Sequence, residues 1–431
     1  MTPSCESQPI DWSATYGRLA GAVPDLAAAA TPIVTGFEVC LDRIIDLHAV
    51  APSLSLLDEP GARGLFAELM ARVQRGRGGE LLVSDWPDGP AFLDPATLPD
   101  GIAIGGTSAQ AAWTLAEMGA PAVLALGDAG SDELSVLHPG IGIVTAAGLL
   151  GSSLDRRPSP TGKPAHYILE YTAGRPLLGI TPERSTRIIV RFADEELQTD
   201  ALFDAWITAH GHRLRAGLLS SPNTVPFGEF PAALDRLTTT ARAWRRAGLV
   251  EVHLELAAFP WPGACEATLE RLGPEVTSIG LNQNELGALV PGDHPVAQAD
   301  ELSRRYGIGR LVVHADGWAL AITHGDPAIE FDALATGCLV AAARAAAGEP
   351  PNRPRLPLGA RFGSLPAPSV GRLADGRSVV CVAAPYLSNP RSTVGLGDSF
   401  AAGSLLVHSI PDYRPRLTAA GSPIPSAPPE R

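Results

Sequence analysis

A glycine-rich turn followed by an aspartate lies near the C-terminal end of the chain, in the segment STVGLGDSFAAG (392–403). Gly395 and Gly397 allow a phosphate to approach the backbone N–H groups at the start of a predicted helix, where the helix dipole also favours an anion. A site that only binds anions gains nothing from a carboxylate. A phosphoryl-transfer site, however, needs a base, and Asp398 is the candidate. The simpler alternative is that Asp398 is the helix N-cap.

Two further segments carry carboxylates at the predicted ends of strands. In EVHLELAA, alternation places His253 and Glu255 on one face of a strand. In SIGLNQNELGAL, Asn282 and Glu285 stand three residues apart at a strand-to-helix turn, a spacing that suits oxygen ligands of a hydrated Mg²⁺. The alternatives are a solvated edge strand for the first segment and a helix capping box for the second.

Asp42 and Gly106 are candidates for contact with a polar ligand. Asp42 ends the apolar run TPIVTGFEVCLD, which predicts one strand, and its carboxylate would accept from sugar hydroxyls or cap a turn. Gly106, in GGTSAQAAW, would admit a polyol close to the backbone or simply form a tight turn. These segments all fall at predicted strand ends, where open α/β sheets bind their ligands.

The elements that must position these residues alternate between strands and helices from residue 216 onward. Such alternation predicts a parallel sheet with helices on both faces. Residues 160–195 differ, because their short strands AHYILEY, LLGITP and STRIIVRFA have no predicted helix between them. They indicate a separate β-rich element. Residues 1–30 favour helix, and the proline-rich tail 413–431 is predicted to be disordered.

Composition excludes several classes of function. Among 431 residues, 46 are acidic and 33 are Lys or Arg, giving a net charge of -13 without a basic run that would follow a nucleic acid backbone. The five cysteines show no metal-ligand spacing, which argues against a structural zinc and fits a reducing cytoplasm. The N-terminal sequence lacks an export signal, and no apolar run reaches the roughly 20 residues that span a bilayer. We expect a cytoplasmic protein that binds neither nucleic acid nor membrane.

Taken together, the motifs resemble those of a known family. TVGLGD, NQNE and HLE are similar to the GxGD, NxxE and HxE motifs of the ADP-dependent glucokinase and phosphofructokinase family, within the ribokinase superfamily. Asp42 in CLD, Glu80 in GGELL, and His166 with Glu170 in AHYILEY match further family segments. The resemblance extends over residues 31–408.

The resemblance implies an α/β, ribokinase-like fold in which a mostly parallel central sheet of roughly eight to ten strands is flanked by helices. A smaller β-rich lid domain would be inserted within the kinase domain 31–412, from segments near 40–100 and 160–195. The implied reaction is transfer of the β-phosphate of ADP to a hydroxyl of a hexose or hexose phosphate, giving AMP, with Mg²⁺ as cofactor. A monomer is expected.

The resemblance also implies a role for each matching residue. Asp398 would be the catalytic base, and Gly395 and Gly397 would belong to the anion hole. The Mg²⁺ would be organised, mostly through water, by Glu255, Asn282 and Glu285. The sugar would contact Asp42, Glu80, Gly106 and His166. The nucleotide would lie near His314, Val394, Gly395 and Gly397.

Three departures from the family pattern bear on the ligands. Cys40 replaces the Asn of the NxD motif and Thr107 replaces a Gln or Asn, so the identity of the sugar stays open. Gln283 replaces a common acidic residue within NxxE and reduces the negative charge near the metal.

The substrate and the donor both have alternatives. Glu80 and His166 favour an unphosphorylated hexose such as glucose, whereas Arg187 and Arg191 in STRIIVR would serve as a clamp for the phosphate of fructose 6-phosphate. An ATP-dependent ribokinase-like kinase would present the same base and anion hole. A catalytically weak sugar- or nucleotide-binding regulator is the alternative outside enzymes.

Overall fold

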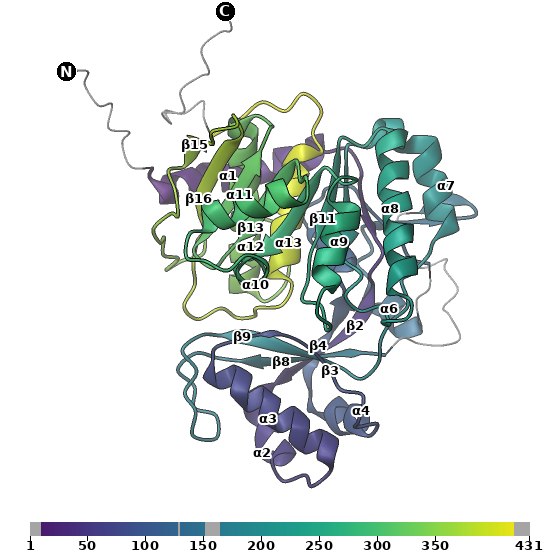
Figure 1. Ribbon diagram of the computed structural model, residues 1–431, viewed down its shortest axis with the longest axis vertical. Helices are drawn as coiled ribbons and strands as arrows, with labels where there is room; N and C mark the ends of the chain where they lie inside the picture. Colours follow the sequence, from purple (N-terminus) through teal and green to yellow (C-terminus); the bar gives the residue numbers. More distant parts are fainter. Residues whose placement is uncertain (1–9, 128–129, 151–163, 418–431) are drawn as a thin grey trace, which may run out of the picture.

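The computed structural model describes residues 10–127, 130–150 and 164–417, which form two β-sheets with flanking helices (Figure 1). The larger sheet has 11 strands and the smaller has five. The α/β fold with a central sheet and a smaller β-rich part is as predicted. The larger sheet exceeds the expected eight to ten strands because short antiparallel strands extend both of its edges.

Neighbouring strands of the larger sheet are parallel from β13 through β6 and antiparallel toward both edges. In spatial order the strands are β15 (Val370–Arg372), β16 (Ser378–Ala383), β14 (Trp318–Thr323), β13 (Arg310–His314), β12 (Ser278–Asn282), β11 (Glu251–Glu255), β10 (Ala216–Ser220), β1 (Ile33–Gly36), β5 (Ala122–Leu124), β6 (Ile141–Thr145) and β7 (Gly148–Leu150). The carboxyl ends of β11, β12 and β13 therefore lie side by side, which brings the predicted motif residues to one edge of the sheet.

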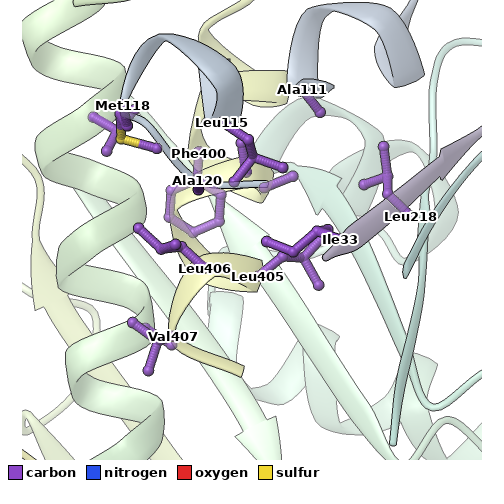
Figure 2. Close-up of a cluster of buried hydrophobic side chains, with 14 of the residues drawn as sticks. Ile33, Ala111, Leu115, Met118, Ala120, Leu218, Phe400, Leu405, Leu406 and Val407 are labelled. Carbon is purple, nitrogen blue, oxygen red and sulfur yellow. The ribbon is translucent and has the colours of Figure 1, made fainter. Parts of the chain in front are cut away.

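Helices cover both faces of the larger sheet. One face carries α1 (Trp12–Ala29), α5 (Thr107–Glu117), α12 (Pro327–Ala347) and α13 (Leu396–His408). The other carries α7 (Ala201–His210), α8 (Phe230–Ala247), α9 (Ala264–Leu272), α10 (Gln283–Leu289) and α11 (Pro295–Arg305). Figure 2 shows the first of these two cores, where Phe400 and Leu405 of α13 lie near Leu115 of α5 and Ile33 of β1. This packing fixes α13, and hence the glycine turn at its start, on the sheet.

The smaller sheet draws its strands from residues 40–105 and 166–191, compared with the expected lid segments of about 40–100 and 160–195. Its strands, in spatial order, are β3 (Gly79–Leu82), β9 (Thr186–Arg191), β8 (His166–Tyr171), β2 (Cys40–Asp46) and β4 (Thr97–Gly105). The helices α2 (Leu47–Leu54), α3 (Pro60–Gln74) and α4 (Gly89–Leu93) lie on the face turned away from the larger sheet (Figure 1). The remaining short elements of the described residues are α6 (Ser131–Val136) and the single-turn 3-10 helices Asp94–Ala96 and Gly211–Arg213.

Alternation along β8 separates apolar from polar side chains. Tyr167, Leu169 and Tyr171 join the core beneath the helices of the smaller sheet. His166 and Glu170 occupy the alternate positions, and the pleat directs them to the opposite face. That face is turned toward the larger sheet, so the smaller sheet presents its polar side chains to the space between the two.

The run TPIVTGFEVCLD is two strands, not the single predicted strand ending at Asp42. β1 belongs to the larger sheet and β2 to the smaller, and the chain crosses between them at residues 37–39. Asp42 consequently lies within β2 rather than at a strand end. The sequence gives no sign of this break because Gly36 and Phe37 are buried as deeply as the strands on either side.

The segment that follows α13, up to Leu417, packs against the rest of the protein. The phenol of Tyr413 donates to the buried Asp332 at 2.7 Å, and the Leu417 side chain is buried. The predicted disordered tail is therefore wrong for 413–417, and its remainder, 418–431, lies outside the described residues. Within the described residues, no helix is long and apolar enough to cross a membrane.

Candidate active site

The glycine turn forms the start of α13. Gly395 is the N-cap, with a φ of 66° that favours glycine. Asp398 lies one turn further on, inside the helix, so the alternative that it is the N-cap is wrong. Its carboxyl accepts a hydrogen bond from the side chain of Thr107 on α5, and burial raises its pKa to about 6. A carboxyl with that pKa is largely ionised at neutral pH and still basic enough to accept a proton.

A buried arginine lies directly against this turn. A Cβ on Gly395 would overlap the guanidinium of Arg344, which projects from α12. Arg344 donates to Ser399 Oγ at 3.0 Å and to Gln110 Oε1 at 2.5 Å, both uncharged acceptors. Only 2% of the residue is exposed. The turn thus combines helix N–H groups with a buried positive charge.

The charge of Arg344 is not neutralised by a close carboxylate. Among the described residues, the guanidinium of Arg344 donates to uncharged acceptors, and its Nε has no hydrogen-bond partner. Burial lowers its pKa to about 10, an effect that the more distant Asp398 partly offsets. A buried and unpaired cation is unfavourable unless an anion completes the site. The turn therefore offers a favourable position for an anionic group.

Glu255 joins the carboxyl edge of the larger sheet to the turn. The two oxygens of its carboxylate accept from His253 Nε2 at 2.9 Å and from His314 Nε2 at 3.0 Å. Burial alone would raise its pKa, but these two histidines hold the pKa of Glu255 at about 2. β11 is a buried central strand, so the solvated-edge alternative for His253 and Glu255 is wrong. Gly280 on β12 leaves the space that Glu255 occupies.

His314 makes the connection to the glycine turn. It ends β13, opposite Asn282 in the parallel register, and a Cβ on Gly397 would lie 3.2 Å from its Cε1. Burial disfavours its protonation, but the Glu255 carboxylate raises the pKa of His314. Glu255, His314 and Gly397 therefore form one contiguous line from the sheet to α13.

Asn282 and Glu285 do form the capping box that was the simpler alternative. Asn282 Oδ1 accepts from the N–H of Glu285 at 3.1 Å, and Glu285 Oε2 accepts from the N–H of Asn282 at 2.8 Å. The hydrogen bonds of the box lower the pKa of Glu285 but do not offset its burial. Burial raises the pKa of Glu285 to about 7, and the charge of Glu255 adds to the rise.

These residues fit a hydrated cation better than a directly bound one. A cation near Glu255 and Glu285 would relieve the repulsion that raises the pKa of Glu285. In the described part of the chain, though, the carboxylates and histidines at this edge do not converge within mutual ligand distance. Mg²⁺ normally keeps several waters, so contact through water suits the arrangement.

The smaller sheet contributes a second polar group. Asp42 on β2 and His166 on β8 are paired in the parallel register. Burial raises the pKa of Asp42 to about 6, while the charge of His166 lowers it and that of Asp398 raises it. His166 Nε2 hydrogen-bonds with Glu195 Oε1 at 2.5 Å. The carboxyl group of Asp42, on the smaller sheet, therefore lies close enough to that of Asp398, on α13, for the two charges to interact.

Glu80 lies at the edge of this group and binds Arg191. Arg191 Nε is 3.3 Å from Glu80 Oε2, its Nη1 is 3.8 Å from Asp194 Oδ1, and the residue is 1% exposed. Asn223 Nδ2 donates to both oxygens of Glu80, at 3.2 and 3.3 Å. Arg191, one of the two arginines of the alternative phosphate clamp, is therefore already paired with carboxylates. The charge of Arg187 instead acts on Asp42, Asp398 and Arg344.

Gly106 and Glu38 lie together at the start of α5. Gly106 has a φ of 87°, and a Cβ there would lie 2.7 Å from the carbonyl oxygen of Glu38. The Glu38 carboxyl accepts from the N–H of Thr107 at 3.2 Å. Burial raises the pKa of Glu38 to about 8, and the charge of Glu80 contributes. At neutral pH this carboxyl is largely protonated and able to donate a hydrogen bond.

Val394 belongs to a loop that the smaller sheet holds in place. The carboxylate oxygen Oε1 of Glu170 accepts from the N–H of Thr393 at 2.8 Å and from Ser392 Oγ at 3.0 Å. Ser392 Oγ in turn accepts from the N–H of Val394 at 3.1 Å. Glu170 therefore fixes the backbone that leads into Gly395.

Four residues of this site escaped the sequence interpretation: Glu38, Glu195, Asn223 and Arg344. Arg344 did leave a signal, because it is the one charged residue in the apolar run ALATGCLVAAARAAAG. A charge in a buried helix needs a partner or a function. The other three lie in irregular segments, where no periodicity indicates which way a side chain points.

Comparison with known proteins shows which family the sequence matches. The chain matches the model described as "ADP-specific Phosphofructokinase/Glucokinase conserved region" over residues 32–407. The match includes β1 and most of α13, and thus every element that carries the site.

Solved structures share the fold at low sequence identity. An ADP-dependent kinase in complex with fructose-6-phosphate and ADPbetaS is 15% identical, with a TM-score of 0.75, covering 95% of this chain and 100% of that one. A phosphofructokinase from Pyrococcus horikoshii OT3 with AMP is 16% identical, with a TM-score of 0.67 and coverage of 88% and 98%. The last common ancestor of ADP-dependent phosphofructokinases from Methanosarcinales is 14% identical, with a TM-score of 0.69 and coverage of 93% and 98%.

Proposed function

The chain belongs to the ADP-specific phosphofructokinase/glucokinase family, and we propose that it transfers the β-phosphate of ADP to a hydroxyl of an unphosphorylated hexose such as glucose, releasing AMP. The observation that carries this proposal is the glycine turn, where Asp398 stands beside helix N–H groups and the buried cation of Arg344. A base next to an anion site is what transfer of a phosphoryl group to a hydroxyl requires.

In the proposed reaction, Asp398 accepts the proton of the sugar hydroxyl as its oxygen attacks the β-phosphorus of ADP. The new P–O bond forms while the bond between that phosphorus and the bridging oxygen breaks, and AMP leaves with the bridging oxygen. The N–H groups of Gly395 to Asp398 and the guanidinium of Arg344 stabilise the charge on the phosphoryl oxygens. The Arg344 side chain need not rearrange to take this role, because Ser399 and Gln110 already hold its guanidinium in place.

Mg²⁺ would be held through water by Glu255, Asn282 and Glu285. When bound, it would neutralise charge on the phosphate groups of the nucleotide. The hydrogen bonds of His253 and His314 keep Glu255 ionised and fix its direction. His314 also packs against Gly397, so the orientation of Glu255 is coupled to the turn.

The sugar would lie between Asp42, Glu80, Gly106 and His166. The choice of an unphosphorylated sugar rests on Arg191, whose charge is already matched by Glu80 and Asp194. A phosphate near Glu80 would also meet Glu38 and Glu195, which act electrostatically within the same group. Hydroxyl groups, by contrast, can donate to these carboxylates and accept from the protonated Glu38 and from His166.

A panel of donors and acceptors tests the proposal. The purified protein with Mg²⁺ is given ADP or ATP, each with glucose, fructose 6-phosphate or no sugar, and the nucleotide products are separated. We expect AMP only from ADP with glucose. AMP formed with fructose 6-phosphate and not with glucose would reverse the substrate assignment, ADP formed from ATP would reverse the donor, and no turnover with any pair would favour a binding protein.

A further inference from the structure

Three buried side chains of the smaller sheet, those of Cys40, Asp42 and His166, bring their polar atoms close together. The proposed kinase reaction has no role for the Cys40 thiol. Cys40 Sγ lies 3.4 Å from His166 Nδ1 and 3.7 Å from Asp42 Oδ1. One ligand atom from each residue, all three of them buried, lies within 4.8 Å of the others. A thiol, an imidazole and a carboxylate at such distances form a mixed S, N, O ligand set.

The sheet itself places these atoms. Cys40 and Asp42 are two residues apart on β2, so their side chains share one face, and Asp42 is paired with His166 on the adjacent β8. Cys40 is also opposite Gly105 on β4, where the absence of a side chain leaves space for its sulfur. The ligand set is therefore preorganised by strand register rather than by loops.

The spacing matches tetrahedral coordination of a zinc-class ion. With a metal–sulfur bond of about 2.3 Å and metal–nitrogen or metal–oxygen bonds of about 2.0 to 2.2 Å, a tetrahedral site separates sulfur from the other ligands by about 3.5 Å. The observed separations of 3.4 and 3.7 Å lie on either side of that value. No backbone displacement is needed to bring sulfur into range of both partners.

The carboxylate of Glu195 hydrogen-bonds with the ring nitrogen of His166 that faces away from Cys40. Glu195 Oε1 is 2.5 Å from Nε2 of His166, on the side of the ring opposite Cys40. When Nε2 donates to this carboxylate, Nδ1 presents its lone pair toward Cys40 and Asp42. Metal-binding histidines almost always have such a partner, which fixes the ring and increases its basicity.

We propose that Cys40, Asp42 and His166 form a three-ligand site for a thiophilic divalent cation of the zinc class. Binding displaces two protons to solvent, one from the Cys40 thiol and one from Nδ1 of the His166 imidazolium, and leaves a fourth position for water. The site is separate from the proposed Mg²⁺ position, because Mg²⁺ disfavours sulfur. The cysteine spacing in the sequence argued against a structural zinc held by several cysteines. It does not bear on this site, because its ligands lie at positions 40, 42 and 166 and include a single cysteine.

A consequence follows for the proposed kinase activity and rests on it. Asp42 and His166 are also the residues proposed to hold the sugar, so the cation and the sugar exclude each other. Zn²⁺ is then an inhibitor that competes with the sugar and not with ADP. This gives the enzyme a sensitivity to thiophilic metals that an Asn at position 40 would not confer.

Cobalt substitution tests the metal site without any kinase assay. Co²⁺ is added to the purified full chain in the absence of sugar and nucleotide, and the visible and near-ultraviolet spectrum is recorded. We expect the d–d bands of a tetrahedral ion and a thiolate-to-cobalt charge-transfer band that saturates at one ion per chain and disappears when Zn²⁺ is added.

Matched variants identify the residue that supplies the thiolate of the charge-transfer band. Cys40→Ser should abolish the charge-transfer band, whereas the double variant Cys5→Ser/Cys265→Ser should retain it. Glu195→Gln should weaken Zn²⁺ binding by about 10- to 100-fold while preserving all three ligands. If Cys40→Ser fails to fold, His166→Gln provides the same test through loss of the tetrahedral bands. Absence of the band from the wild-type protein, or its persistence in Cys40→Ser, would overturn the site.

Inhibition kinetics separate this inference from the proposed function. Zn²⁺ should raise the KM for glucose without changing the KM for ADP. A cobalt–thiolate band without inhibition of an active kinase would support the metal site and overturn the competition. An active kinase without the band would overturn the metal site and leave the kinase assignment intact.

Discussion

The guanidinium of Arg344 packs against Gly395 so closely that a Cβ at this glycine would lie 2.5 Å from both of its terminal nitrogens. The same glycine has a φ of 66°. Position 395 therefore excludes a side chain for two independent reasons, one in the backbone and one in the contact with the buried cation. The contact ties α12 to the turn that begins α13, and the charge of Arg344 becomes part of the anion site.

Gly395→Ala should lower both stability and turnover. The left-handed backbone costs an alanine about 1–2 kcal/mol, and the methyl group also displaces Arg344. Gly119→Ala is a matched control, because Gly119 has a φ of 82° and nothing within 4 Å of a Cβ. Urea unfolding should show a loss in both variants, larger in Gly395→Ala, and kcat should fall at least about tenfold only in that variant. Equal behaviour of the two would show that the contact with Arg344 is unimportant.

The pH profile should report the ionisation of Asp398 and its dependence on Arg344. Because the pKa of Asp398 is about 6, kcat/KM should fall as pH decreases through 6 and the base becomes protonated. The charge of Arg344 favours the ionised carboxylate, so Arg344→Met should move this acid limb to higher pH. Arg344→Lys should largely restore its position, and Arg372→Met, at an exposed arginine, should not move it. An unchanged limb in Arg344→Met would mean that the two charges do not interact.

Glu170→Ala should slow the reaction by releasing the loop before the turn. Glu170 accepts from the N–H of Thr393 and from two hydroxyls. Hydrogen bonds to a charged group contribute about 1.5–3 kcal/mol, so we expect kcat/KM for ADP to fall by roughly 10- to 100-fold. Glu170→Gln, which retains an acceptor oxygen, should lose less. Glu68→Ala removes a carboxylate that bonds with Arg72 on the surface, and it should have no effect. Equal rates in Glu170→Ala and Glu68→Ala would contradict this coupling of the two sheets.

Glu80→Ala should change the choice of sugar. The variant removes an acceptor for hydroxyls and frees Arg191 from one of its two carboxylates. The ratio of kcat/KM for glucose to that for fructose 6-phosphate should fall by at least about tenfold, corresponding to roughly 1.4 kcal/mol. Glu183→Ala, at an exposed residue, is the control. A ratio that does not change would remove Glu80 and Arg191 from the account of specificity.

The motif residues could be predicted because parallel strands bring their carboxyl ends to one edge. His253, Glu255, Asn282 and His314 belong to three adjacent strands, and alternation alone gave the shared face of His253 and Glu255. The sequence did not distinguish a capping box from a metal site at Asn282 and Glu285. Both descriptions need the same two side chains, and the structure shows that forming the box leaves the Glu285 carboxyl near Glu255.

The partners of these residues were harder to predict because tertiary packing decides them. The pairing of Arg191 with Glu80 depends on β9 lying beside β3, although the two are about a hundred residues apart in sequence. Alternation places Arg187 and Arg191 on the same face of β9, but it carries no information about the carboxylates opposite. The break between β1 and β2 was missed for a similar reason, since buried residues continue across it.

The most direct test of the central claim is AMP formation from ADP with glucose and Mg²⁺, measured in the wild-type protein and in Asp398→Asn. We predict that the wild type forms AMP and hexose phosphate in equal amounts. Asp398→Asn should do so about 10²- to 10⁴-fold more slowly, while glucose still raises its melting temperature. Wild-type rates in Asp398→Asn, or no AMP from the wild-type protein, would contradict the account.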